Sequence, residues 1–115
     1  MKISIIGSRN FNDYLLVEST ILENLELSEI KMIISGGAVG ADSLGEIFAK
    51  KYNIETKIFY PDWKLFGRAA GIIRNKDIIN NCDIVFAFWD GKSKGTKNSL
   101  DIAKKVNKKC VLKII

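Results

Sequence analysis

The chain has 115 residues, of which 47% are hydrophobic and 27% charged, the balance of an ordinary globular domain. This length has room for one core, so we expect residues 1–115 to form a single domain that gains further stability as a homo-oligomer. Histidine is absent, which excludes a Ser-His-Asp triad, a Cys-His pair and most catalytic zinc sites. The net charge of +5 favours anionic partners, including nucleotides and nucleic acids.

The chain alternates short β-branched runs with longer amphipathic stretches, a pattern that predicts strand–helix units feeding a parallel sheet. A strand is expected at residues 2–6, then a helix that is capped near Asn12 and Asp13 and buries Val17, Ile21 and Leu25. The next strand spans residues 31–35, and a helix follows from about residue 41 to 52. Its inward face is expected to carry Leu44, Ile47, Phe48 and Tyr52.

The second half repeats this alternation after a strand at residues 56–60 and an irregular segment at residues 61–67. A helix at about residues 68–80 is expected to bury Ala69, Ile72, Ile73 and Ile79, and a strand follows at residues 84–89. The last helix, at about residues 96–107, runs through Leu100, Ala103 and Val106, and a strand at residues 110–115 completes the sheet. Most strands are continuous apolar runs, which is typical of a sheet covered on both faces.

The two cysteines, Cys82 and Cys110, each open an apolar run, where a thiol usually serves as a small buried hydrophobe. The first apolar run is too short for a secretory signal, and no stretch approaches the ~18 apolar residues that span a bilayer. We therefore expect a cytoplasmic protein with reduced thiols and no membrane partner.

Ligands of open α/β sheets bind outside the carboxyl ends of the strands, and three such junctions here are rich in glycine and small polar residues. They are Gly7-Ser8-Arg9-Asn10, Ser35-Gly36-Gly37-Ala38-Val39-Gly40-Ala41-Asp42 and Asp90-Gly91-Lys92-Ser93-Lys94-Gly95-Thr96. Glycines between a strand and a helix let backbone N–H groups approach an anion at the helix N-terminus. Gly36, Gly37 and Gly40 therefore fit a phosphate cradle, although the segment matches neither the dinucleotide fingerprint nor a Walker A loop. The alternative is a tight turn in which Asp42 caps the helix.

The third junction offers a second phosphate or ribose contact through Asp90, Gly91, Ser93, Gly95 and Thr96, with Thr96 as a plain N-cap residue in the alternative reading. Arg9 and Arg74 suit a bidentate grip on phosphate, and a structural salt bridge is the alternative for Arg74. Trp89 is expected to pack at the strand end. For Trp63, base stacking and packing both stay open.

Four segments, IIGSRNF, ISGGAVGAD, PDWKLFGRAAGIIRN and DIVFAFWDGKSKGT, together resemble the SLOG superfamily, which includes Lonely Guy phosphoribohydrolases and DNA-processing protein A. The resemblance is to its small stand-alone YAcAr-type branch and covers nearly the whole chain. It implies an α/β three-layer Rossmann-like sandwich with a five-stranded parallel sheet in the order 3-2-1-4-5. It also implies a ligand such as a nucleoside monophosphate, ADP-ribose or a related signalling nucleotide. The residues it assigns to that ligand are Gly7, Ser8, Arg9, Gly36, Gly37, Gly40, Asp42, Arg74, Asn75, Asp90, Gly91, Gly95 and Thr96.

The chain departs from the enzymes of this superfamily at one position. Lonely Guy enzymes carry a Gly-Thr-x-x-Glu segment whose glutamate helps to cleave the N-glycosidic bond, and here Ser99 stands in its place. The leading hypothesis is therefore a binding or sensing domain without strong turnover. If the chain hydrolyses nucleotides, Asp42 and Asp90 are the candidate catalytic carboxylates.

A third hypothesis, single-stranded DNA binding, rests on the basic charge and on the resemblance to DNA-processing protein A. It is disfavoured because no row of exposed aromatics interleaved with lysines is evident. The sequence identifies no cofactor and no metal ligands, and it leaves open whether a divalent metal accompanies the phosphates.

Overall fold

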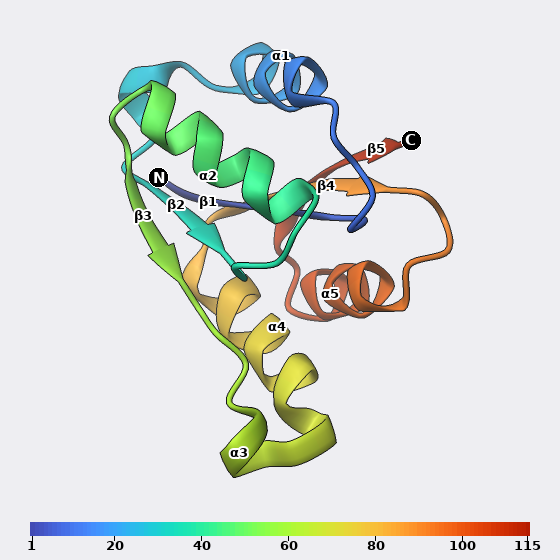
Figure 1. Cartoon of the computed structure of the whole chain (residues 1–115). Helices are drawn as coiled ribbons and strands as arrows, with labels where there is room; N and C mark the ends of the chain where they lie inside the picture. The colour runs from blue at the N-terminus through green and yellow to red at the C-terminus, as the bar shows by residue number, and fades with distance from the viewer.

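The structure, a computed structural model, describes all 115 residues. Five parallel strands form one sheet in the order β3-β2-β1-β4-β5 (Figure 1). Their bounds are β1 (Lys2–Gly7), β2 (Met32–Ser35), β3 (Glu55–Ile58), β4 (Ile84–Trp89) and β5 (Lys109–Ile114). The expected parallel sheet and its strand order are confirmed.

Helices cover both faces of the sheet, which makes the expected three layers. On one face lie α1 (Tyr14–Asn24) and α2 (Ala41–Lys51), and on the other lie α4 (Ala70–Asn81) and α5 (Lys94–Lys105). Three short elements complete the chain: the 3-10 turns η1 (Leu27–Glu29) and η2 (Gly67–Ala69), and the one-turn helix α3 (Trp63–Phe66). None of the helices has both the length and the apolar character needed to cross a membrane.

The core has one half on each side of the sheet, because successive strand residues point to opposite faces. Ile3 and Ile5 face α1 and α2 together with Phe86 and Phe88, while Ile6 faces α4 and α5. The central strands β1 and β4 are thus buried on both faces, as their continuous apolar sequences predicted.

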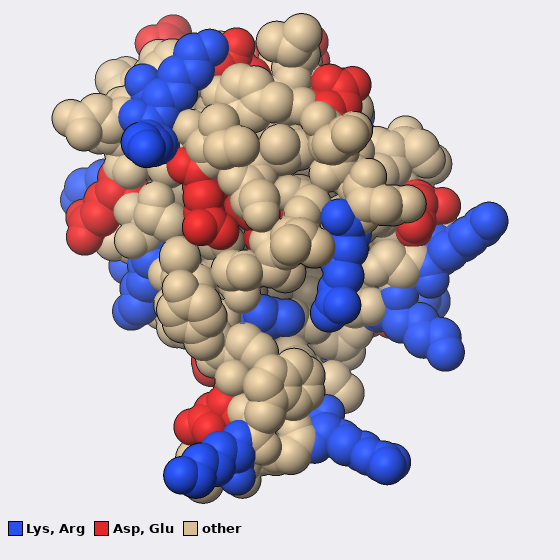
Figure 2. Space-filling view, viewed as in Figure 1, with Lys and Arg blue, Asp and Glu red and all other residues tan.

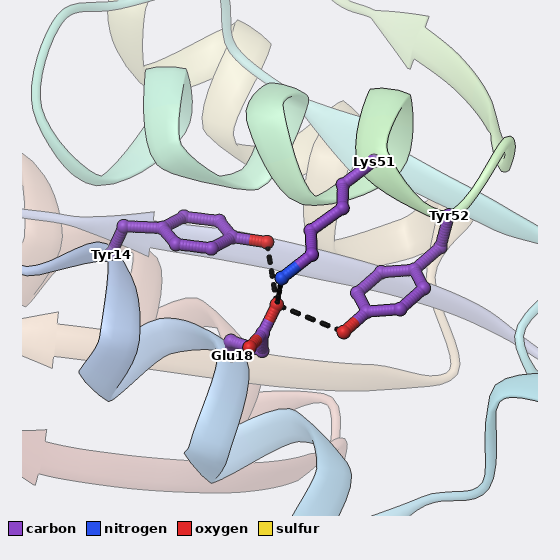
Figure 3. Close-up of polar contacts among 4 residues, drawn as sticks. All are labelled: Tyr14, Glu18, Lys51 and Tyr52. Atoms are coloured by element: carbon purple, nitrogen blue, oxygen red, sulfur yellow. Dashed lines mark hydrogen bonds and ion pairs between the residues drawn. The ribbon is translucent and has the colours of Figure 1, made fainter.

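A polar cluster fixes α1 against α2 (Figure 3). One carboxylate oxygen of Glu18, Oε2, accepts hydrogen bonds from the Tyr14 hydroxyl at 3.0 Å, the Lys51 ammonium at 2.6 Å and the Tyr52 hydroxyl at 2.9 Å. The bonds from Lys51 and Tyr52 lower the pKa of Glu18, and the bond to Glu18 raises the pKa of Lys51. Every member of the cluster therefore has its partners within the protein.

The expected irregular segment at residues 61–67 is wrong, because Asp62 caps the helical turn α3 by accepting a hydrogen bond from the Leu65 N–H at 3.0 Å. The following helix begins at Ala70 rather than residue 68. Ala69 and Ile72 are exposed, and Ala70 and Ile78 are buried in their place. The physical reason is visible in Figure 1, where α3 and the first turn of α4 project beyond the sheet and have no strand beneath them.

Three further burial expectations are wrong: Ile47, Val106 and Cys110 are exposed. Ile47 lies beside the inward face of α2, Val106 follows the last turn of α5, and Cys110 lies on the edge strand β5, which helices cover incompletely. Cys82 is buried as expected, and both thiols are free.

Candidate functional site

A cleft of about 430 Å³ opens at the carboxyl ends of β1, β2 and β4. It lies where the strand order reverses, since β1 leads to β2 on one side and β4 leads to β5 on the other. This crevice is where open α/β sheets bind ligands. Figure 2 shows a hollow near the centre of this face with basic atoms inside and beside it.

The structure brings most of the predicted site residues together around this cleft. Those that line it are Gly7, Ser8, Arg9, Asp42, Arg74, Asn75, Asp90, Ser93, Gly95 and Thr96. Asn10, Ala38 and Ser99 were not predicted as ligand contacts, yet they line the cleft with Ile6 and Ile78. Both Asn10 and Ser99 had a signal in the sequence: Asn10 ends the first junction, and Ser99 replaces the glutamate of the Gly-Thr-x-x-Glu segment one helical turn beyond Thr96.

Four of the predicted glycines and one tryptophan do not line the cleft: Gly36, Gly37, Gly40, Gly91 and Trp63. Gly40 shows what the glycines do instead. Its φ is +81°, and a Cβ there would lie 2.4 Å from the Ser8 carbonyl oxygen. Glycine therefore lets the β2–α2 loop touch the β1–α1 loop, and the Ala41 N–H donates to Ser8 O at 3.4 Å.

Arg74 reaches from α4 to the β2–α2 loop, where its Nη1 donates to the Gly36 carbonyl oxygen at 2.7 Å. Its Nε donates to Asn75 Oδ1 at 3.1 Å. A Cβ at Gly36 would lie 2.8 Å from Nη1, so the glycine makes room for the guanidinium. The alternative of a structural salt bridge is wrong, since neither ion pair of the structure includes Arg74. Arg74 is therefore held by the Gly36 carbonyl and by Asn75 rather than by an ion pair, and it lines the cleft beside Asp42.

The loop after β1 presents free backbone donors. Its conformation is fixed by buried Ser8, whose N–H donates to Phe88 O at 3.0 Å and whose Oγ accepts from the Asp90 N–H at 3.1 Å. The N–H groups of Arg9 and Asn10 donate to no protein acceptor. Both residues line the cleft, so an anion bound there would find these donors unoccupied.

Asp42 is a buried carboxylate in the first turn of α2. The N-cap position belongs to Gly40, so the reading of Asp42 as the cap residue is wrong. Its Oδ2 instead accepts from the Ala38 N–H at 3.3 Å. Burial raises the pKa of Asp42 to about 6, against the opposing effects of the Ala38 hydrogen bond and the positive charge of Arg74. A carboxyl that titrates near neutral pH in a cleft is typical of functional sites.

Asp90 is held differently, because its Oδ1 accepts from the N–H groups of Lys92 and Ser93, each at 2.8 Å. These backbone hydrogen bonds lower its pKa. Asp90 is thus an ionised loop anchor with its carboxylate at the cleft. Trp89 helps to fix the same loop, since its Nε1 donates to Ser93 O at 3.0 Å, in agreement with its expected packing role.

The N-terminus of α5 closes the cleft opposite α2. Ser93 takes the N-cap position, so the reading of Thr96 as N-cap is wrong. Thr96 is buried in the first turn with its Oγ1 3.2 Å from Ser93 Oγ. First-turn N–H groups have no intrahelical partner and carry the positive end of the helix dipole. Two helices, α2 and α5, therefore begin at the same cleft.

Three aromatic side chains, one after β3 and two on α3, are exposed. Tyr60 is 71% exposed, and a Cβ at Gly37 would lie 2.9 Å from its ring, which places it next to the cleft-lining Ala38. Trp63 is 59% exposed on α3 and packs near Gly71. Phe66 is exposed as well. None of the three lines the cleft itself, and Tyr60 is the one that packs beside a cleft loop, at Gly37.

No group of three or more His, Cys, Asp or Glu side chains is arranged to hold a metal ion.

Comparisons with known proteins agree on the fold. Gene 61 protein of Mycobacterium phage D29 is 29% identical over 111 residues, which cover 90% of this chain and 89% of the phage protein. A solved structure of DNA processing protein A from Helicobacter pylori, described for its single-stranded DNA binding mode, superposes with a TM-score of 0.74 and 21% identity. The superposition covers 97% of this chain but only 64% of the Helicobacter chain. This likeness shows a shared fold.

A family model gives the chain its place among these proteins. The model of the YspA, cpYpsA-related SLOG family, YAcAr, matches residues 1–66, more than half of the chain and the part that carries the first two cleft loops. The chain therefore belongs to the YspA, cpYpsA-related SLOG family.

Proposed function

We propose that the cleft binds a phosphate-bearing nucleotide derivative, such as a nucleoside monophosphate or ADP-ribose, and that the domain acts as a binding or sensing module. One observation carries this proposal: the N-termini of α2 and α5 and the side chains of Arg9 and Arg74 converge on one cleft. Helix N-termini bind phosphate through their free N–H groups and dipoles, and arginine binds it through paired donors.

The size and the remaining lining suit a nucleotide. A cleft of about 430 Å³ lies within the range of small-molecule sites. Asp42, Asn75 and Ser99 supply acceptors and donors for sugar hydroxyls beside the phosphate site. We assign the phosphate to the Arg9–Asn10 and Gly95–Thr96 donors, and the ribose to the Asp42 side.

The same cleft also has a candidate proton donor. Asp42, whose pKa is about 6, suits general acid–base chemistry near neutral pH. Yet Ser99 lines the cleft at the position where the related glycosidases carry glutamate, so no carboxylate is available there to stabilise an oxocarbenium-like centre. Binding without turnover is therefore our first choice.

A thermal-shift screen against AMP, ADP-ribose, NAD and cyclic nucleotides, with chromatography for released base, tests this proposal. We expect a saturable rise in Tm with at least one phosphate-bearing nucleotide and no released base. Arg9→Met should weaken binding about 10- to 100-fold, the effect of one charged hydrogen bond, because Arg9 is exposed and lines the cleft. Arg68→Met is the matched control, because Arg68 is exposed on η2, away from the cleft.

Two results would contradict the binding module. The absence of any shift would remove nucleotides as ligands. Released base would establish the N-glycosidase alternative, and Asp42→Asn and Asp90→Asn would then identify the carboxylate that carries the reaction.

Tyr60 favours single-stranded DNA as a second candidate. An exposed ring beside a basic cleft is the combination on which single strands stack, and the similar Helicobacter protein is described for binding such DNA. An oligothymidylate with a 5′-phosphate should then bind in competition with AMP, lose affinity steeply with salt, and bind less tightly to Tyr60→Ala. If AMP does not displace the oligothymidylate, the DNA binds outside the cleft.

A further inference from the structure

The charges of this protein are segregated along the chain. Residues 10–30, which contain α1 and η1, include five of the 13 acidic side chains and none of the 18 basic ones. The acidic residues are Asp13, Glu18, Glu23, Glu26 and Glu29. Glu18 is paired with Lys51 in the cluster between α1 and α2, so Asp13, Glu23, Glu26 and Glu29 carry the unpaired negative charge of this segment.

The acidic segment also carries an exposed apolar stripe. Leu15, which is 74% exposed, Ser19 and Leu22 follow one another at helical spacing on the outer face of α1. They share an open groove, which we call the α1 groove. Its lining residues are Asp13, Leu15, Leu16, Glu18, Ser19 and Leu22.

The opposite end of the molecule has the complementary chemistry. Residues 62–69, which we call the arm, contain α3 and η2 and are exposed without exception. The arm presents Trp63, Leu65 and Phe66, and its basic residues are Lys64 and Arg68. It projects from the end of the molecule opposite α1 (Figure 1), and Figure 2 shows basic atoms on both sides of this projection.

We propose that the arm of one copy docks in the α1 groove of a second copy, head to tail. Apolar side chains on each surface leave water together, while Lys64 and Arg68 face Asp13 in the groove and the neighbouring unpaired acidic side chains of α1 and η1. The two surfaces lie at opposite ends of one molecule, so a single chain does not satisfy them itself. The proposal does not depend on the ligand of the cleft.

The exposure of Leu65 on the arm favours a protein as its partner over a nucleic acid. Leu65 is 69% exposed, and an aliphatic side chain has no face on which a base stacks, whereas it packs well against Leu15 and Leu22. The contact is heterologous, so each added copy leaves one arm and one groove free. Because both surfaces are small, we expect weak association that grows with protein concentration and declines with added salt.

Sedimentation velocity on the full chain and two double variants tests the proposal. The arm variant is Leu65→Glu with Phe66→Glu, and the groove variant is Leu15→Lys with Leu22→Lys. The arm variant places acid opposite the acidic groove, and the groove variant places base opposite the basic arm. All four positions are exposed, so Tm should be unchanged. We expect the natural chain to form a concentration-dependent series of oligomers and each variant to stay monomeric.

An equimolar mixture of the two variants gives the decisive result. The groove variant keeps an intact arm and the arm variant keeps an intact groove, so together they should form a one-to-one complex, although neither variant associates alone. The AMP response of both variants should match that of the natural chain, which separates this proposal from that for the cleft. A natural chain that stays monomeric at every concentration and salt would overturn the proposal. So would loss of oligothymidylate binding, rather than of self-association, in the arm variant.

Discussion

Asp42 at the cleft and Glu18 between α1 and α2 are both carboxylates held by hydrogen bonds, but their surroundings differ. Three side-chain donors converge on Glu18, and the bonds from Lys51 and Tyr52 lower its pKa. Asp42 accepts one long bond from Ala38, and burial raises its pKa to about 6. Nearby, the N–H groups of Arg9 and Asn10 have no acceptor. A polar cluster whose groups satisfy one another fixes helices, whereas one with unused donors and a perturbed acid is equipped to bind a ligand.

The largest expected effect is that of a substitution at Gly40, where the β1–α1 and β2–α2 loops of the cleft touch. Gly40→Ala should abolish nucleotide binding and lower the free energy of unfolding, because the new Cβ meets the Ser8 carbonyl at 2.4 Å in a residue with φ of +81°. Gly91→Ala is the control, since Gly91 has φ of +80° and open space around it, and it should cost only about 1–2 kcal/mol. Urea unfolding measures the loss of free energy of unfolding in both variants. If Gly40→Ala and Gly91→Ala lose the same amount, no backbone clash occurs at Gly40.

Asp42→Asn should stabilise the protein at neutral pH. The native pKa of about 6 lies above the ordinary value of 3.8, so the stability that this group supports is fully present below pH 3.8 and is lost as pH rises through 6. A pKa difference of about two units corresponds to about 3 kcal/mol in the free energy of unfolding. The neutral amide of the Asp42→Asn variant should recover this free energy at pH 8 and not at pH 3.5. Urea unfolding at both pH values measures this difference, and a gain of equal size at both would contradict it.

Glu18→Gln should have the opposite pH dependence. The lowered pKa of Glu18 means that its contribution to stability is present above its ordinary value of 4.5 and is lost as pH falls through the native value. The Tm of the variant should therefore be lower than that of the natural chain at pH 7, and the two Tm values should become equal in acid. The variant should bind AMP as tightly as the natural chain. Glu23→Gln is the control on the same helix. Weaker AMP binding in Glu18→Gln would show that the cluster also shapes the cleft.

Trp63→Ala should produce the smallest effect. The side chain is 59% exposed and lies outside the cleft, so the free energy of unfolding should change by less than about 0.5 kcal/mol and the affinity for AMP should be unchanged. Calorimetric titration in dilute solution measures the affinity. A lower affinity would bring Trp63 into contact with the ligand.

The place of the cleft was predictable from the sequence, and its finer geometry was not. Parallel strands bring their carboxyl ends to one edge, so the loops after β1, β2 and β4 had to meet, and Arg9, Arg74 and Asp90 meet there. The roles of Gly40 and Gly36 depend on contacts with Ser8 and Arg74, which are far away in sequence and leave no local signal. Ile72 was misread because hydrophobic periodicity does not reveal where a helix extends beyond its sheet.

Amide chemical-shift changes during a titration with AMP test the central claim most directly, because they report on the cleft and on the Glu18 cluster in one experiment. We predict saturable shifts for the amides of Arg9, Asn10, Ala38, Gly95 and Thr96, with those of Glu18, Lys51 and Tyr52 unchanged. If AMP and ADP-ribose both leave the cleft amides unchanged, or shift the Glu18 cluster instead, the cleft is not the nucleotide site.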